Sequence, residues 1–425
     1  MHTEIQKNRY TIKAFENKGK RPVELSHPLN MKPHPLSYME LPFDPEYFLY
    51  NNRMSPESLN NVTPDEQYWA VRQNVIFRNT GEFPVEISGP DAIEFANYIF
   101  TRDISKINEG RCSYQFACYH DGGMITDGIM LHLNKNKLWM AQADGELFKW
   151  YLAFSNNFDV KITDPNVFVT QIQGPKSMDL LSELIDDDLS WKYFDIAEVY
   201  IKGEPIIITR TGFTNELGWE FYLRPENDAE LIGNHIMQIG EKYGMILAGT
   251  PGFRARRIEA GLLSANNDFT KNTTPFEVGL GKFVDLNKSD FVGKKALEKA
   301  EKKSKIWGIK VKDGIALRGN NISISNKNIG VISSSTWSPY LECGVGIVRL
   351  DLDDIEIGTK VDVISINGEK LMAEICSLPM YDEKGLILRG IDKNIPNKPN
   401  PWLSLIHISE PTRQAEISYA VFCLK

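Results

Sequence analysis

The sequence predicts an α+β protein whose sheets are mostly antiparallel and whose C-terminal part is a small β-barrel. From about residue 64, short strand patterns alternate with helical patterns, and helices begin at signals such as Thr63-Pro64-Asp65-Glu66. A tight turn, Asp121-Gly122-Gly123, joins two strand-like stretches within 111–133, which is typical of an antiparallel hairpin. After residue 306, short strand patterns separated by Gly and Asn turns indicate a barrel of about 85 residues.

Each element is expected where a periodic stretch lies between such turn signals. The expected helices are 63–74, 91–100, 145–154, a segment after Lys176, 227–244, 251–263 and the Lys-rich stretch 293–305. The expected strands outside the hairpin are 85–88, 138–143, 159–163, 167–174, 198–203, 206–212 and 219–224, followed in the barrel by 307–313, 329–338, 344–350, 360–366 and 370–378.

The chain is expected to divide into an extended, Pro-rich arm over residues 1–45, a first domain over 46–290, a barrel domain over 291–392 and a tail over 393–425. Within the tail, residues 403–425 (LSLIHISEPTRQAEISYAVFCLK) resemble the in-frame translation of a sequencing-library adapter. We therefore expect them to be non-native, the alternative being a short natural strand-rich tail.

Composition excludes several classes of function. The 425 residues carry a formal net charge of -8, which argues against nucleic acid or an anionic membrane as the general partner. The five cysteines form no C-x-x-C pair and no Cys/His cluster, so we expect neither a metal site nor a disulfide framework. No apolar export signal or membrane-length stretch is present, and a cytoplasmic location is expected.

Common catalytic motifs are missing as well. The chain has no G-x-G-x-x-G after a strand, no G-x-x-x-x-G-K-[ST], no G-x-S-x-G and no H-E-x-x-H. Nucleotide, acyl-transfer and zinc-peptidase chemistry therefore lack their residues, and any chemistry must come from scattered polar groups.

Asp127 is the first candidate, because alternation along its strand places it on a face with aliphatic residues. Burying an ionised carboxylate costs several kcal/mol unless it is paired. A two-residue turn places Tyr114 and Phe116 on the same face, whereas a three-residue loop would reverse that pairing. We expect a carboxylate in an aromatic pocket that tunes its pKa, the alternative being an Asp that anchors the turn.

A second carboxylate, Glu220, begins a strand beside Trp219 after a Gly-bounded loop. It suits the paired N–H donors of a flat heterocycle, the alternative being an exposed edge residue. Arg254 and Arg257 lie one helical turn apart and Glu259 follows, so an anion clamp and an internal ion pair both stay open.

The Thr-Pro turn before Phe276 and Glu277 can cap a site or merely end a loop. The two histidines nearest Asp127 in the sequence are not obvious proton donors. His120 lies at the turn, and His132 lies on the opposite face of the strand.

Taken in order, these segments resemble the folate-dependent aminomethyltransferase family, which includes the glycine cleavage T-protein and the dimethylsulfoniopropionate demethylases. The resemblance covers about residues 45–390 and rests on GRCSYQFACYHDGGMITDGIM, QIQGPKS, RTGFTNELGWEF, RIEAGLLSANNDFTKNTTPFEVGL, DFVGKKAL and SSSTWSPYLECGVGIVRL. It implies three subdomains in a cloverleaf around a central channel that binds tetrahydrofolate.

Carried over by position, the resemblance implies roles for single residues. Asp127 looks like the catalytic Asp near the folate nitrogens, and Tyr114, with Phe116, looks like a wall of the folate site. Glu220, with Trp219, looks like the carboxylate that holds the pterin ring. The residues expected to contact the donor substrate are Tyr50, Arg78, Trp139 and Trp337.

Departures from the family concern the donor pocket. Where T-proteins have a Phe-Asp-x-Ser-His-Met-like segment, this chain reads FRNTGEFPVEIS, with Arg78 in place of the Asp and Gly81 where the His falls. Phe253 replaces an Arg at the start of the 253–262 helix, and YNNRM (50–54) stands where demethylases have a Tyr-Asn-His-Met-like segment.

We therefore expect a tetrahydrofolate-dependent methyltransferase whose donor is a small S-, N- or O-methyl compound, dimethylsulfoniopropionate-like or otherwise. One alternative is the glycine cleavage T-protein, which needs a lipoyl carrier protein as partner. Another is a non-catalytic folate-binding regulatory protein, but that branch carries a Lys-Gly-Cys-Tyr-like motif where this chain has DFVGKKAL. A cationic donor is expected if Tyr114, Phe116, Trp139 and Trp219 offer it ring faces rather than serving as ordinary core.

Overall fold

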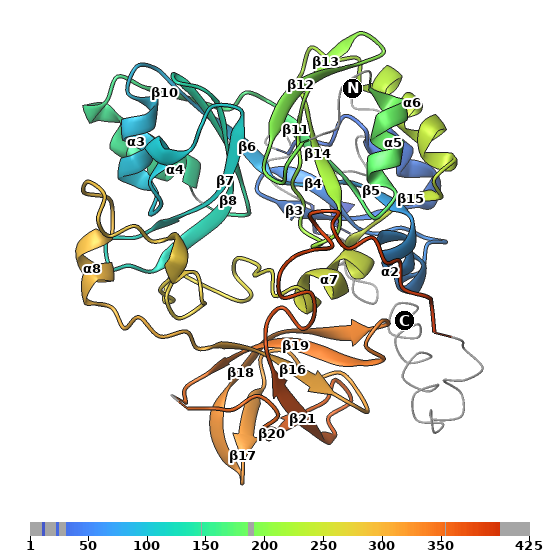
Figure 1. The fold of residues 1–425 in the computed structure, drawn as a ribbon, viewed down its shortest axis with the longest axis vertical. Coiled ribbons are helices and arrows are strands. Elements are labelled where there is room, and N and C mark those ends of the chain that lie inside the picture. The colour runs from blue at the N-terminus through green and yellow to red at the C-terminus, as the bar shows by residue number, and fades with distance from the viewer. Residues whose placement is uncertain are drawn as a thin grey trace.

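The computed structural model describes residues 11–12, 23–24, 31–145, 147–185, 191–352 and 354–399. Three lobes, two built on sheets and one a barrel, surround a central region that contains helix α7 (Figure 1). The α+β cloverleaf and its C-terminal barrel are thereby confirmed. The adapter-like stretch 403–425 lies outside the described residues.

The first lobe is a five-stranded antiparallel sheet of order β10-β6-β9-β8-β7. Helices α3 and α4 cover its outer face and close a hydrophobic core against Val85, Met130 and Met140. The expected hairpin is its most prominent part. The elements are β6 (Phe83–Ser88), α3 (Ala92–Ile99), η5 (Ile104–Lys106), β7 (Arg111–Cys118), β8 (Met124–Asn134), β9 (Lys137–Gln142), α4 (Leu147–Phe154), η6 (Ser155–Asn157) and β10 (Lys161–Thr163).

The second lobe is a six-stranded sheet of order β12-β13-β14-β11-β5-β15. All its pairs are antiparallel except β5 with β15. Helices α5 and α6 pack on its outer face. The elements are β5 (Val75–Asn79), β11 (Phe168–Gln173), α5 (Ser177–Leu184), β12 (Ile196–Ile201), β13 (Glu204–Thr209), β14 (Gly218–Leu223), α6 (Ala229–Glu241) and β15 (Met245–Leu247).

The inner faces of the two sheets pack on each other through a mixed cluster that includes Leu131 and Trp139 from one sheet and Val169 and Tyr222 from the other. A hairpin of β3 (Glu46–Tyr50) and β4 (Arg53–Ser58) lies beside this junction. Arg53, fully buried at its tip, stacks between two aromatic rings, 4.6 Å from the Phe83 centroid and 4.7 Å from that of Phe168. The hairpin therefore ties the two sheets together.

Residues 31–45 do more than lie extended over the surface, which differs from the arm we expected. They contain two short 3-10 helices, η3 (Ser37–Met39) and η4 (Leu41–Phe43), and bury Leu36 in the core of the second lobe. Apolar residues recur every few positions in this segment and pack into the core. Its Pro content had indicated an extended arm instead. Two further short strands, β1 (Thr11–Ile12) and β2 (Val23–Glu24), pair with each other.

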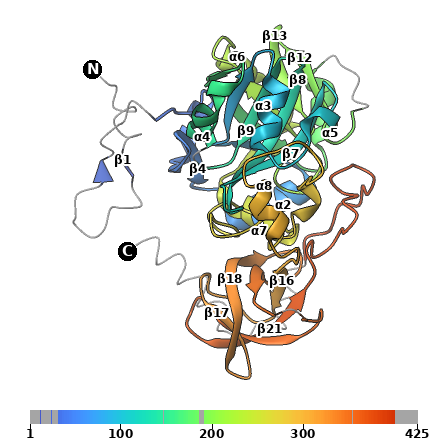
Figure 2. The ribbon, with the colours of Figure 1, turned by 90° about the vertical axis from the view of Figure 1, so that its left-hand side faces the viewer.

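The third lobe is a closed barrel of order β16-β19-β18-β17-β20-β21 (Figure 2). Five of its strands were expected, and β17 was missed because it is only four residues long. The Lys-rich helix is also shorter than expected, since α8 ends where Lys302 bonds the carbonyls of Glu298 and Ala300. The elements are η7 (Gly281–Phe283), α8 (Lys294–Lys299), β16 (Ile306–Val311), β17 (Asn321–Ile324), β18 (Lys327–Ser338), β19 (Cys343–Leu350), β20 (Lys360–Ile364) and β21 (Lys370–Cys376).

Two helices join the lobes. Helix α2 (Pro64–Gln73) begins as predicted, with a capping box in which Thr63 and Glu66 satisfy each other's backbone N–H groups. It packs against α7 (Thr250–Glu259), which also contacts the barrel strands β18 and β19. Polar groups on α7 therefore lie between the sheets and the barrel.

Candidate functional site

Asp127 lies on β8 directly opposite Phe116 of β7. The Tyr114 hydroxyl donates a hydrogen bond of 2.6 Å to Asp127 Oδ2. The Tyr114 ring packs edge-on against Phe283, with centroids 5.2 Å apart, and lies 6.0 Å from the Phe116 ring. The expected shared face of carboxylate and aromatic rings is therefore present. The loop itself spans three residues, since Tyr119 N donates to the Gly123 carbonyl, and a register shift between Ala117 and Cys118 restores the expected pairing.

Burial sets the charge state of this carboxyl. Asp127 is 6% exposed, and desolvation raises its pKa to about 6. The Tyr114 hydrogen bond opposes this rise, while the charge of Asp268 adds to it. The group can therefore hold or release a proton near neutral pH, which an exposed Asp does not do.

A row of polar side chains crosses four neighbouring strands of the second lobe. Strand register places Arg78 of β5 opposite Gln171 of β11, Gln171 opposite Glu220 of β14, and Glu220 opposite Thr209 of β13. Residues in register across a sheet point to the same face. Because Tyr222, two residues after Glu220, packs in the cluster between the two sheets, this row faces the first lobe.

Glu220 is well supplied with donors. Gln171 Nε2 donates to its Oε1 at 2.7 Å, and the Thr211 hydroxyl donates to its Oε2 at 2.5 Å. Burial nevertheless raises its pKa to about 7, and the charge of Glu82 contributes to the rise. Two carboxyls with raised pKa values, Asp127 and Glu220, thus lie on elements that border the centre of the molecule.

Trp219 does not accompany Glu220 at this face, because consecutive strand residues face opposite sides. Its ring is fully buried in the core under α5 and α6, with its centroid 5.4 Å from that of Trp191. Trp139 lies in the cluster between the sheets, where its Nε1 donates to Glu86 at 3.0 Å. Trp337 lies on β18 of the barrel, partly exposed.

Tyr50 lies near Asp127, and Arg78 lies in the polar row beside Gln171. Burial raises the pKa of Tyr50, and so do the charges of Glu82 and Asp127. Arg78 Nη2 donates to Thr250 Oγ1 at 3.0 Å, and its guanidinium stacks 4.6 Å from the Phe253 ring centroid. Phe253 stands where the resemblance implies an arginine, and Arg78 stands where it implies an aspartate. In this chain the Phe253 ring packs against Arg78 and supports it.

The arginines of α7 form internal ion pairs, which decides between the two alternatives left open. Arg257 bonds Asp268 at 2.8 Å in a buried pair, and Arg254 bonds Glu57 at 3.0 Å near the surface. Arg256 contacts Glu259 at 3.3 Å. These side chains connect elements rather than offering a free anion clamp.

The Thr-Pro turn is likewise a structural feature. Thr274 and Glu277 satisfy each other's backbone and side-chain groups, at 2.8 Å and 3.0 Å. Phe276 packs in the core beneath the β7–β8 hairpin. The two histidines face away from Asp127: His132 Nδ1 lies 2.7 Å from the Ile107 carbonyl, and the His120 ring packs near Trp150.

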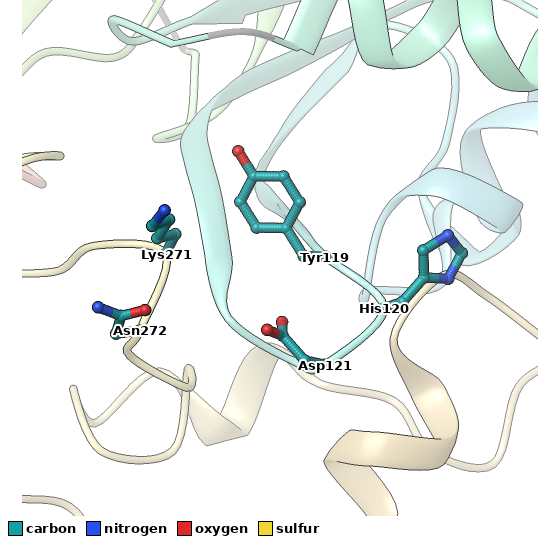
Figure 3. Close-up of a pocket in the computed structure, with 5 residues that line it drawn as sticks. All are labelled: Tyr119, His120, Asp121, Lys271 and Asn272. Carbon is teal, nitrogen blue, oxygen red and sulfur yellow. The ribbon is translucent and has the colours of Figure 1, made fainter.

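Surface cavities occur in the described part of the chain. One of about 410 Å³ lies at the β7–β8 turn, where Tyr119 and Asp121 face Lys271 and Asn272 and His120 points aside (Figure 3). Another, of about 380 Å³, is lined by Trp139, Glu86 and Arg224 among others. Neither includes Asp127 or Glu220.

Sequence reasoning missed Glu82 and Gln171. Glu82 lies in the short link between β5 and β6, and the buried atom Glu82 Oε2 has no hydrogen-bond partner among the described residues. Gln171 Oε1 is also buried and has no hydrogen-bond partner among the described residues. A signal was present for Gln171, since a glutamine between Val169 and Ile172 in a strand pattern is unusual, but its partners come from other strands.

The described residues contain no group of three or more His, Cys, Asp and Glu side chains that could hold a metal ion. Among the helices of that same part, none is both long enough and apolar enough to cross a membrane.

Comparison with known proteins gives the class first. The residues 35–288 match the GCVT N-terminal domain, and residues 305–382 match the glycine cleavage T-protein C-terminal barrel domain. An aminomethyltransferase of Alkaliphilus oremlandii is 33% identical over 310 residues, covering 70% of this chain and 83% of the relative. The protein is therefore an enzyme of the tetrahydrofolate-dependent one-carbon transferases. It belongs to the glycine cleavage T-protein family.

One further relative and one solved structure are also similar to this chain. The trimethylamine-oxide aldolase of Ruegeria pomeroyi is 30% identical over 365 residues, covering 80% of this chain but only 46% of the relative. The crystal structure of glycine cleavage system aminomethyltransferase T from Bartonella henselae has the same fold, with a TM-score of 0.75 at 21% identity. It covers 83% of this chain and 99% of that one.

Proposed function

We propose that this enzyme moves a methyl group from a small methylated donor to tetrahydrofolate, with Asp127 as the catalytic carboxylate. The observation that carries the proposal is a carboxyl that is 6% exposed, faces aromatic rings and has a pKa of about 6. Such a group stabilises positive charge or accepts a proton where water does not screen it.

Tetrahydrofolate supplies a ring nitrogen that receives the one-carbon unit. The hydrogen-bonding groups around Glu220 fit the N–H edge of the pterin ring of tetrahydrofolate. Glu220 accepts from Gln171, Thr211 and, at 3.4 Å, Tyr222, which leaves part of the capacity of about four acceptor sites on a carboxylate. We assign Glu220 to this edge, and Tyr114 with Phe116 to a wall of the same site.

On the donor side, we assign Tyr50, which lies near Asp127, and Arg78, which lies in the polar row beside Gln171. Trp139, Trp219 and Trp337 are left out because of where the structure places them. The name of one relative, trimethylamine-oxide aldolase, favours an N-methyl compound over S-methyl and O-methyl donors. Dimethylsulfoniopropionate belongs in the test panel as the S-methyl candidate.

The test is incubation of the full chain with tetrahydrofolate and a panel of N-, S- and O-methyl donors, with folate products separated by mass. We expect 5-methyl-tetrahydrofolate with at least one donor. Asp127→Asn serves as the inactive control, and Glu109→Gln, at an exposed position, as the active one. Failure of every donor to alkylate the folate contradicts the proposal.

A second candidate is aminomethyl transfer in the glycine cleavage system, because several relatives about 30% identical are named aminomethyltransferase. That reaction needs a lipoyl carrier protein as partner. It predicts 5,10-methylene-tetrahydrofolate from an aminomethylated lipoyl carrier and no product from free methylated compounds. The same mass measurement therefore separates the two candidates.

A further inference from the structure

The segment 281–292, which begins with η7, lies along the C-terminal end of α3. Thr101 Oγ1 donates to the Phe283 carbonyl at 3.1 Å, and the Asp285 N–H donates to the Thr101 carbonyl at 3.0 Å. Further along, the Val292 N–H donates to the Tyr98 carbonyl at 2.9 Å. These hydrogen bonds therefore attach the 281–292 segment to the first lobe.

Lys288 binds the end of the helix directly. Its Nζ donates to the carbonyls of Asn97 and Phe100, both at 2.5 Å, and to that of Arg102 at 3.4 Å. The last carbonyls of a helix have no partner within it, and a cation is favourable beside them. An ammonium group has three donors, so each of the three carbonyls receives one.

Lys288 is more buried than lysines usually are. It is 9% exposed, and burial lowers its pKa to about 7. The charges of Asp103 and Asp285 oppose this shift, whereas those of Lys294 and Lys106 add to it. Removing an ammonium group from water is costly, so a lysine that only capped the helix would be expected in solvent. Its burial between α3 and the 281–292 segment indicates that it fixes one against the other.

Phe283 connects the 281–292 segment to the candidate site. Its ring packs edge-on against that of Tyr114, with centroids 5.2 Å apart, and the Tyr114 hydroxyl donates to Asp127 Oδ2 at 2.6 Å. The Phe116 ring, also near Tyr114, belongs to the same strand, whereas Phe283 comes from a distant part of the chain. The place of the Tyr114 hydroxyl therefore depends on where the 281–292 segment lies.

We propose that Lys288 is a positioning residue for the transfer reaction. Its ammonium group holds the 281–292 segment on α3, and Phe283 of that segment holds the Tyr114 hydroxyl on Asp127. The inference rests on the proposed function for the part that Asp127 has in methyl transfer. Lys288 itself acts through Phe283 and Tyr114 and not on the reacting atoms.

The test is the pKa of Asp127 in Lys288→Met, which keeps an apolar side chain of similar length and removes the ammonium group. Weakening the Tyr114 hydrogen bond should raise this pKa, because the bond lowers it in the wild type. Carbon-13 NMR of the full chain, labelled at aspartate carboxyls, measures the pKa without any substrate, and Asp127→Asn assigns the signal. Lys288 keeps most of its charge near pH 6, where Asp127 titrates.

Lys295→Met is the matched control, since Lys295 is an exposed lysine of the neighbouring helix α8. It should leave the pKa of Asp127 where it is in the wild type. An unchanged or lowered pKa of Asp127 in Lys288→Met would overturn the inference, even if that variant is less stable, because a merely structural lysine need not affect Asp127.

A second variant guards against misfolding of the first. Phe283→Leu removes the ring contact but keeps the Lys288 hydrogen bonds, and it should also raise the pKa of Asp127. Lys288→Met added to Phe283→Leu should raise that pKa no further, because the two residues act in series; additive rises would contradict the inference.

Turnover gives the last measurement. The acidic limb of the rate of Lys288→Met should move to higher pH together with the pKa of Asp127, with little change in KM for tetrahydrofolate. A raised pKa of Asp127 in the variant, without methyl transfer by the wild type, refutes the proposed function alone. Methyl transfer by the wild type, with an unshifted pKa in the variant, refutes this inference alone.

Discussion

The Tyr114 hydroxyl lies 2.6 Å from Asp127 Oδ2 and donates to it across the β7–β8 hairpin. The two residues are not directly opposite, since Tyr114 pairs with Ile129 and Asp127 with Phe116. The bond is therefore a diagonal one on a single face, and the packing of the Tyr114 ring on Phe283 supports it. It offsets part of the desolvation that raises the pKa of Asp127.

Replacing Asp127 by Asn should separate binding from chemistry. The amide keeps the shape of the carboxyl but neither carries charge nor accepts a proton at neutral pH. We expect tetrahydrofolate affinity to change little and turnover to fall by about 10²-fold or more. Single-turnover rates and calorimetry on the same preparation measure both. A variant with the wild-type rate would remove Asp127 from the chemistry.

The pH profile of turnover should respond to Tyr114. If ionised Asp127 is the active form, the rate rises as pH passes about 6. Tyr114→Phe removes a hydrogen bond that lowers this pKa, so the acidic limb should move to higher pH. Tyr119→Phe, at the nearby turn, is the matched control and should leave the limb in place. A limb that stays or moves to lower pH in Tyr114→Phe contradicts the assignment.

Stability should depend on pH in the opposite sense to that of a salt-bridged carboxylate. The folded pKa of Asp127, about 6, lies above its ordinary value of 3.8, so folding favours the protonated form. The stabilisation of the folded state that comes from protonated Asp127 is fully present below about pH 4, and it is lost as pH rises through about 6. This amounts to about 2 to 3 kcal/mol in the free energy of unfolding. The difference between wild type and Asp127→Asn, followed by denaturant unfolding from pH 4 to 7, should show that slope.

Glu220→Ala should weaken folate binding by about tenfold or more, because a charged acceptor is worth about 1.5 to 3 kcal/mol. The substitution also frees Gln171 and Thr211, so Glu220→Gln, which keeps an acceptor, should lose less. Calorimetric titration with tetrahydrofolate ranks the variants. Equal affinity of Glu220→Ala and wild type would show that the pterin edge binds elsewhere.

Strand alternation explains both what the sequence predicted and where it misled. Alternation alone placed Asp127 on one face with Tyr114 and Phe116, and the hairpin has that arrangement. The same rule separates Trp219 from Glu220, but proximity in the sequence suggested a shared role. A neighbour along a strand is the residue least able to join a side chain at its site.

The rest of the candidate site depends on pairings between distant segments, which one sequence does not display. Gln171 meets Arg78 and Glu220 only because β11 lies between β5 and β14. Glu82 lies at the junction of the two sheets because the chain passes there from β5 of one sheet to β6 of the other. Local signals therefore predicted the helices, hairpin and barrel, whereas the order of strands in the sheets determined which polar groups meet.

Two of the arginine pairs of α7 differ sharply in burial. Arg257 and Asp268 form a buried pair, and the side chain of Asp268 is fully buried, whereas Arg254 and Glu57 are about 40% exposed. Arg257→Leu leaves a buried carboxylate without its cation, so the free energy of unfolding should fall by about 3 to 5 kcal/mol. Arg254→Ala should change it by less than about 1 kcal/mol, because solvent screens an exposed pair. Denaturant unfolding of both variants measures the difference. Since the charge of Asp268 already raises the pKa of Asp127, losing Arg257 should also move the acidic limb of turnover upward. Equal stability losses in the two variants would show that burial does not set the strength of these pairs.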